Sequence, residues 1–148
     1  MTDRLFCDTN LLIYAIDPRD PAKRAMSAEL ISRGVSQRRL VLSPQILNEC
    51  YWVLVHKRRM SPSSEAERYL AAFLPSCTAP LDGQTHAAAI AIERRHRLSW
   101  WDSLALASAL QAGCRFFVSE DMKDGQTVDA LQIINPFTPH GRTALALT

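Results

Sequence analysis

The 148-residue chain lacks any apolar run close to the roughly 18 residues that a membrane-spanning helix requires. Its first residues include Asp3 and Arg4 before a short apolar patch, which is not the pattern of a secretory signal. We therefore expect a cytoplasmic protein with no membrane partner. The length corresponds to one domain large enough to bury a sizeable core, and 47% hydrophobic with 22% charged residues is typical of a globular protein.

The sequence also lacks the cysteine and histidine spacing of a zinc site. No C-x-x-C pair occurs, each cysteine lies in or beside an apolar stretch, and the histidines are not closely spaced: Cys7, Cys50, Cys77, Cys114, His56, His86, His96 and His140. We interpret the cysteines as reduced core residues. No G-x-S-x-G sequence or placed Cys/His pair supports a serine or cysteine hydrolase.

Charge of one sign is not in large excess either. The net charge is +2, so no strong basic field indicates a nucleic-acid partner. The basic residues are nevertheless grouped in three runs, at 38–39, 56–59 and 94–97. Such runs are usually solvated helix ends or loops, and contact with phosphate is the alternative.

What the chain does contain is an alternation of short apolar segments with segments of helical periodicity. We expect strands at 4–7, 40–42, 115–118 and 131–134, and a weak one at 77–81, where Pro80 disfavours a central strand. We expect helices at 10–16, 22–33 (ending at Gly34), 44–59, 61–75, 84–96 and 99–113. This order predicts an α/β fold with a parallel sheet covered on both faces. We place the domain at 1–137 and expect the C-terminal tail, 138–148, to be partly disordered.

Four acidic residues stand at positions that a simple solvent-exposed role does not explain. Asp8 and Asp121 follow two strands whose carboxyl ends share one edge of a parallel sheet. Glu49 lies at the edge of the buried stripe of its helix, where an unpaired carboxylate is costly. Asp102 projects from the first turn of the helix before strand 115–118, along its packed face. From the chain order we expect Asp102 at the opposite edge of the sheet, unless a long connection brings the helix start round.

Each acid also has a simpler interpretation. Asp8 or Asn10 suits a helix cap or Asx-turn, Ser99 and Asp102 fit a capping box, and Glu49 is long enough to reach water. Taken together, however, the carboxylates repel one another and have no basic neighbour, so a cation is the natural compensation. Oxygen ligands favour Mg²⁺ or Mn²⁺, and such ions usually serve phosphate chemistry.

The ordered set of motifs resembles the PIN-domain ribonucleases of the VapC toxin type. The matching segments are Phe6–Asn10, Leu47–Cys50, Ser99–Ala109, Val118–Met122, Asp124–Gly125 and Asn135–Phe137, which cover nearly the whole domain in order. The resemblance implies a three-layer α/β/α sandwich with a mainly parallel five-stranded sheet. It also implies that the helix beginning near Asp102 starts at the strand ends, close to Asp8.

The same resemblance implies the chemistry of the site. Asp8, Glu49, Asp102 and Asp121 would be the catalytic residues and would hold one or two Mg²⁺ or Mn²⁺ ions, whose activated water hydrolyses single-stranded RNA. Thr9, Asn10 and Ser119 would orient the carboxylates through hydrogen bonds. Glu120 is an extra acid beside Asp121, and we expect it to assist or share the metal. Such toxins typically form homodimers and are inhibited by a cognate antitoxin whose C-terminal segment inserts basic or aromatic side chains into the acidic groove.

Two other functions compete with the nuclease. A non-catalytic PIN-like binding module would use the same acidic groove only to dock a basic segment of a partner. A phosphatase of the haloacid-dehalogenase type also opens with an aspartate after a strand. That class needs a second acid two residues later, where this chain has Asn10.

Overall fold

The computed structural model describes residues 3–146, and a five-stranded sheet forms its centre. The strands lie in the order β2-β1-β3-β5-β4, with β1 at Leu5–Cys7, β2 at Leu40–Val41, β3 at Phe116–Val118, β4 at Thr127–Val128 and β5 at Leu131–Ile134. All neighbours pair in parallel except β4 with β5, which are antiparallel. The predicted α/β fold with a mainly parallel five-stranded sheet is therefore confirmed.

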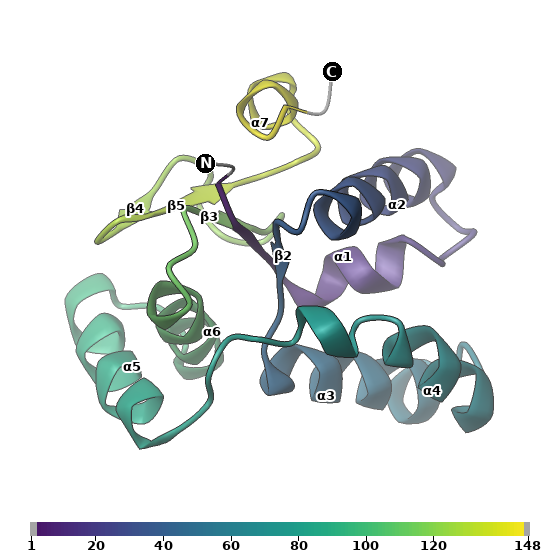
Figure 1. Ribbon diagram of the computed structural model, residues 1–148, viewed down its shortest axis with the longest axis horizontal. Coiled ribbons are helices and arrows are strands. Elements are labelled where there is room, and N and C mark those ends of the chain that lie inside the picture. The colour runs from purple at the N-terminus through teal and green to yellow at the C-terminus, as the bar shows by residue number, and fades with distance from the viewer. Residues whose placement is uncertain (1–2, 147–148) are drawn as a thin grey trace.

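Helices cover both faces of this sheet, with α5 (Gly83–His96) and α6 (Trp100–Gln111) on one side and α1 (Thr9–Tyr14) and α2 (Pro21–Ser36) on the other (Figure 1). The helical elements are α1 (Thr9–Tyr14), α2 (Pro21–Ser36), α3 (Pro44–Trp52), the π-helix η1 (Val53–Lys57), α4 (Ser63–Ala71), the 3₁₀-helix η2 (Leu74–Ser76), α5 (Gly83–His96), α6 (Trp100–Gln111) and α7 (Pro139–Ala144). Among residues 3–146, no helix combines the length and the apolar character needed to cross a membrane.

The central strands are short but wholly buried, as expected for parallel strands covered on both faces. Phe6 of β1 and Phe117 of β3 stack with ring centroids 5.2 Å apart in the middle of the core. Burial of each such ring contributes roughly 1.5 to 3 kcal/mol. Cys7, Cys50 and Cys114 are buried free thiols, as expected of core residues, whereas Cys77 is a free thiol that is only partly buried, so its expected core position is wrong. The core thus fixes the adjacent strand ends from which the acidic side chains project.

Two expectations are wrong, one about the sheet and one about the end of a helix. Segment 77–81 forms no strand and contributes only a single parallel bridge between Leu42 and Cys77, because Pro80 has no amide hydrogen to continue a ladder. The fifth strand is instead β4, which returns onto β5 through a tight turn with Asp129 at a φ of 53°. Gly34 does not end its helix either. It lies inside α2, where an added Cβ would stand 3.1 Å from the Leu40 Cβ, so its small size permits close packing.

The helix expected over 44–59 changes its form at Val53. Residues 44–52 are α-helical, and Val53–Lys57 continue as a π-helix in which the Arg58 amide donates to the Val53 carbonyl at 2.8 Å. Arg59, at a φ of 51°, follows this wider turn. Isolated π-turns inside α-helices are frequent at functional sites.

The segment after residue 137 forms a helix that no pattern in the sequence predicts. Helix α7 begins at the cap Thr138, whose Oγ1 accepts from the Gly141 amide at 2.9 Å. Leu145 is buried in the core, so this part of the tail packs onto the domain. The last two residues of the expected tail, 147–148, and the first two of the chain lie outside the described residues. The boundary at residue 137 stays a prediction.

Candidate active site

Asp8 lies at the carboxyl end of β1, between the neighbouring strand end of β3 and the start of α1. Its Oδ1 accepts from the Thr9 amide at 2.8 Å, so the expected capping role is real. Its Oδ2 accepts from the Ser119 hydroxyl at 3.0 Å, and Ser119 directly follows β3. Because β1 and β3 pair in parallel, their ends bring these two side chains together across 111 residues of sequence.

The electrostatic state of Asp8 is unusual for a helix cap. Burial raises its pKa to about 6, although the hydrogen bonds from Thr9 and Ser119 act in the opposite direction. The negative charges of Asp102 and Glu49 raise this pKa further, which means that both lie near Asp8. The largest charge effects on Asp8 thus come from other acids, so the site carries negative charge that a bound cation would compensate.

Glu49 reaches this site from α3 and is held by two side chains. Thr9 Oγ1 donates to its Oε2 at 2.9 Å, and Gln45 Nε2 donates to its Oε1 at 3.0 Å. Gln45 Nε2 also donates to the Trp101 carbonyl at 3.1 Å, so it connects α3 with the first turn of α6. Gln45 is not among the site residues expected from the sequence, although a glutamine four residues before Glu49 lies on the same helix face.

The expectation that Asp102 lies at the opposite edge of the sheet is wrong. A helix that precedes a parallel strand runs antiparallel to it, so α6 starts at the carboxyl edge and ends where β3 begins. The Trp101–Gln45 contact and the effect of the Asp102 charge on Asp8 place its first turn beside the strand ends. Ser99 Oγ accepts from the Asp102 amide at 3.1 Å, so capping fixes this turn and leaves the carboxylate available.

Asp121 lies on the loop after β3 and is exposed. Asn10 Nδ2 donates to the Asp121 Oδ2 at 2.6 Å. The backbone amide of Asp121 donates to Ser119 Oγ at 3.3 Å. Thr9, Asn10 and Ser119 thus each donate to a different acid: Glu49, Asp121 and Asp8.

Glu120 is directed elsewhere. Tyr14 OH donates to its Oε1 at 2.8 Å, and Lys23 Nζ lies 2.6 Å from its Oε2. Both carboxylate oxygens are therefore occupied by a hydroxyl and a cation of the protein itself. This arrangement sets Glu120 apart from the other four acids.

The donor chemistry of the four acids suits a hard divalent cation. Carboxylate oxygens are the ligands that Mg²⁺ and Mn²⁺ prefer, and the site supplies them without sulfur or imidazole. Within residues 3–146, no three acidic, cysteine or histidine side chains are close enough together to form a ready metal site. The acids therefore fit such an ion by chemistry and charge, and rotation of exposed side chains such as Asp121 would be needed to gather them.

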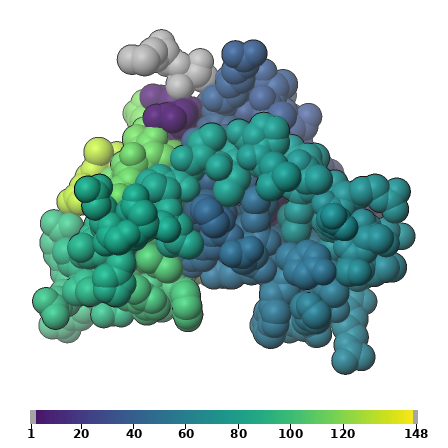
Figure 2. Space-filling model, turned by 60° about the horizontal axis from the view of Figure 1, so that its bottom comes forward, coloured from purple at the N-terminus to yellow at the C-terminus, as the bar shows by residue number. Residues whose placement is uncertain are grey.

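An apolar groove adjoins Glu49 between α3 and α6, and Figure 2 shows the surface hollowed there. Its volume is about 510 Å³, and its lining includes Gln45, Glu49, Trp52, Leu81, Trp101 and Leu104. Trp52 and Trp101 are 54% and 63% exposed, respectively. Two exposed tryptophans beside an acidic site are typical of a surface that a partner covers.

Comparison with known proteins agrees with this geometry. The PIN domain matches residues 5–123, and the chain therefore belongs to the PIN-domain family. This assignment removes the phosphatase alternative. Among curated proteins, none matches the chain. The fold is similar to the crystal structure of VapBC2 from Rickettsia felis bound to a DNA fragment from their promoter, with a TM-score of 0.60 and 12% identity over 87% of this chain and 96% of that one.

Proposed function

We propose that this PIN-domain protein is the VapC-type toxin of a toxin–antitoxin pair and acts as a Mg²⁺- or Mn²⁺-dependent endoribonuclease. The observation that carries the proposal is the half-buried Asp8 carboxylate, whose pKa is raised to about 6 by loss of contact with water, with Asp102 and Glu49 adding to the rise. A protein retains such uncompensated charge at a cost in stability, which is characteristic of functional sites.

In this proposal Asp8, Glu49, Asp102 and Asp121 hold the cation. The bound ion would supply an activated water and neutralise charge on the phosphodiester. Thr9 and Gln45 hold the Glu49 carboxylate from two sides, and Ser119 orients Asp8. Asn10 orients Asp121. Hydrogen bonds of this kind fix the direction of metal-binding carboxylates and commonly affect activity by 10- to 100-fold.

We also propose that the protein acts in the cytoplasm, where its RNA substrate is, and that a cognate antitoxin binds it. The similar fold of VapBC2, solved bound to a DNA fragment from their promoter, supports an antitoxin partner. The exposed Trp52 and Trp101 beside Glu49 offer apolar area next to the acids, which suits an antitoxin segment that inserts basic or aromatic side chains into the groove. Homodimer formation stays a prediction.

The direct test uses purified protein and RNA. Wild-type protein should cut RNA in Mg²⁺ or Mn²⁺ and not in EDTA, and Asp8→Asn should abolish the cutting. Asp124→Asn is a matched control, because Asp124 accepts from the Asn135 amide and lies on the exposed loop. If Asp8→Asn cuts as well as the parent, the activity comes from a contaminant or from another site.

The second candidate is a non-catalytic PIN-like module whose acids only dock a basic segment. It is favoured by the finding that, in the described part of the chain, no three potential ligands already form a metal site. Calorimetric titration with Mn²⁺ separates the two functions. The nuclease requires Mn²⁺ binding that Asp8→Asn weakens, whereas the binding module is supported if wild-type protein takes up no Mn²⁺.

A further inference from the structure

A second pocket, with two cationic side chains in its lining, adjoins Asn10. Its volume is about 240 Å³, and it is lined by Asn10, Ile13, Tyr14, Val53, Lys57 and Arg58. Because the Asn10 side chain lines this pocket and also donates to Asp121, the pocket and the candidate active site are adjacent. A ligand that extends across Asn10 would contact both.

The π-helix η1 places both basic side chains over this pocket. In an α-helix, residue 57 would share the face of Val53, and residue 58 would point about 100° away from residue 57. In η1 the Arg58 amide bonds the Val53 carbonyl five residues back, at 2.8 Å. This wider turn brings Arg58 as well as Lys57 onto the face of Val53, and all three line the pocket.

Neither Lys57 nor Arg58 forms a close ion pair. Arg58 Nη1 lies 3.8 Å from Asp17 Oδ2, but Arg19 already binds that carboxylate through Nε and Nη2 at 2.7 to 3.2 Å. Within residues 3–146, no carboxylate lies within ion-pair distance of Lys57, whose Nζ is 5.9 Å from the centre of the Trp52 ring. Both side chains are exposed and available to an anion.

We propose that this pocket binds a backbone phosphate of single-stranded RNA, at a linkage next to the bond that is cut. The proposal rests on the nuclease function proposed above. A guanidinium and an ammonium form the strongest hydrogen bonds of the protein repertoire with phosphate oxygens. Phosphate contacts set the register of a nucleic acid without reading its bases, so Lys57 and Arg58 are positioning residues.

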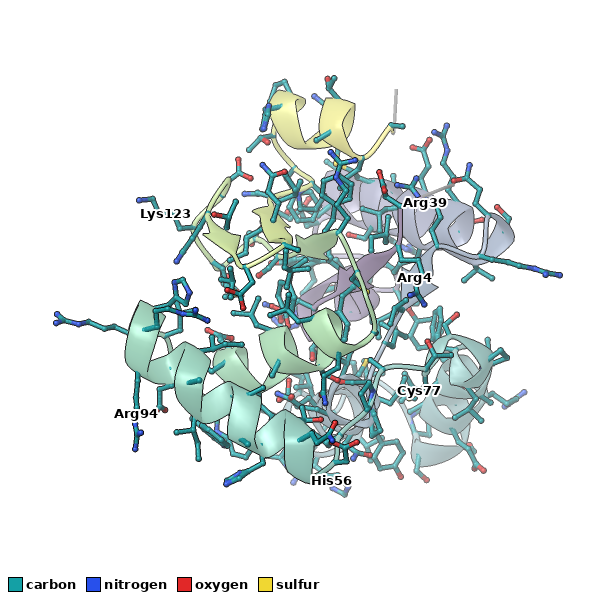
Figure 3. All side chains as sticks on the ribbon, turned by 60° about the vertical axis from the view of Figure 1, so that its left-hand side comes forward. Arg4, Arg39, His56, Cys77, Arg94 and Lys123 are labelled. Carbon is teal, nitrogen blue, oxygen red and sulfur yellow. The ribbon has the colours of Figure 1, made fainter. Side chains whose placement is uncertain are left out.

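The first test compares two double variants that remove the same charge. Lys57→Gln/Arg58→Gln alters the pocket, and Arg94→Gln/Arg95→Gln alters the cluster on α5, where Figure 3 shows Arg94 directed away from the body. Binding of a fluorescein-labelled single-stranded RNA is followed by anisotropy in EDTA at several salt concentrations. We expect the pocket variant to bind roughly tenfold more weakly, with a salt slope lower by about 0.7, since one phosphate contact is lost. The α5 variant should bind like wild type.

A second readout locates the contact on the RNA. Neutral methylphosphonate is placed at one linkage at a time around the cleavage site. At the linkage that occupies the pocket, neutralisation should weaken binding to wild-type protein and leave binding to Lys57→Gln/Arg58→Gln unchanged, since the partner charges are already absent. A merely structural role of the two residues would not produce this coupling. Thermal melting of each variant verifies that it is folded.

The outcomes separate the two proposals. The phosphate pocket alone is overturned if the protein cuts RNA but both double variants lose affinity equally. It is also overturned if no methylphosphonate linkage weakens binding to wild type while leaving the pocket variant unchanged. Wild-type protein that cuts no RNA in Mg²⁺ or Mn²⁺ overturns the nuclease, and the pocket with it.

Discussion

Asp8→Asn is expected to stabilise the metal-free protein at neutral pH while it removes activity. The replacement keeps the shape of the side chain, so the Asn oxygen can still accept from the Thr9 amide. The negative charge disappears from a half-buried position that Asp102 and Glu49 make still less favourable. A functional carboxylate of this kind costs stability until its cation is bound.

The magnitude follows from the pKa of Asp8. A rise of this pKa from 3.8 to about 6 corresponds to roughly 3 kcal/mol of lost stability once the group is ionised. The variant also loses the charge-assisted hydrogen bond from Ser119, which costs about 1 kcal/mol. We therefore expect a net gain of roughly 2 kcal/mol in the free energy of unfolding above pH 6.

The sign of the pH dependence is fixed by the direction of the shift. Between pH 4 and pH 6 the folded protein binds more protons than the unfolded chain, so the contribution of Asp8 to stability falls as pH rises. Urea unfolding in EDTA from pH 4 to 8, followed by circular dichroism, should show the two proteins diverging across this range. Asp121→Asn, at an exposed site, is the control. A variant that is no more stable than wild type at pH 7.5, or a gap independent of pH, would refute the reasoning.

Two further predictions concern the support of the site and the tail. Thr9→Ala removes the hydroxyl that donates to Glu49 at 2.9 Å, so RNA cleavage should fall by roughly 10- to 100-fold. Thr9→Ser, which keeps the hydroxyl, should recover the activity. An alanine variant as active as wild type would count against orientation of Glu49 by Thr9. Gly141→Ala would place a Cβ in steric overlap with the Asn135 carbonyl oxygen, so α7 should be displaced at a cost of roughly 1 to 3 kcal/mol, measured by thermal unfolding. An unchanged melting temperature would contradict the packing of α7.

The central strands and most helices could be predicted because their signals are local. Segments such as Leu5–Cys7 and Phe116–Val118 are wholly apolar, as buried parallel strands require. The two-residue strand β4 exists only through its pairing with β5, and α7 depends on close packing at Gly141, so neither leaves a periodic pattern. Gly34 is ambiguous for the same reason, because its role depends on the distant Leu40.

The acids of the candidate site can be predicted from the sequence because they follow strands or lie beside buried helix faces. Their hydrogen-bond partners depend on tertiary structure and cannot. Asp8 meets Ser119 only because β1 and β3 are neighbours, and Gln45 meets Trp101 only because α3 and α6 start at the same sheet edge. The cationic pocket could not be predicted, since the extra residue in the η1 turn decides which way Arg58 points. The roles of the four acids stay predictions until they are tested.

The central claim is that this PIN-domain protein cuts RNA through its acidic site, and mapping of RNA 5′ ends after induction in cells tests it most directly. Wild-type protein and Asp8→Asn are expressed to the same level, and the ends in total RNA are sequenced. We predict new ends at a restricted set of positions with wild-type protein and none of them with Asp8→Asn. Identical end maps for the two proteins would contradict the account.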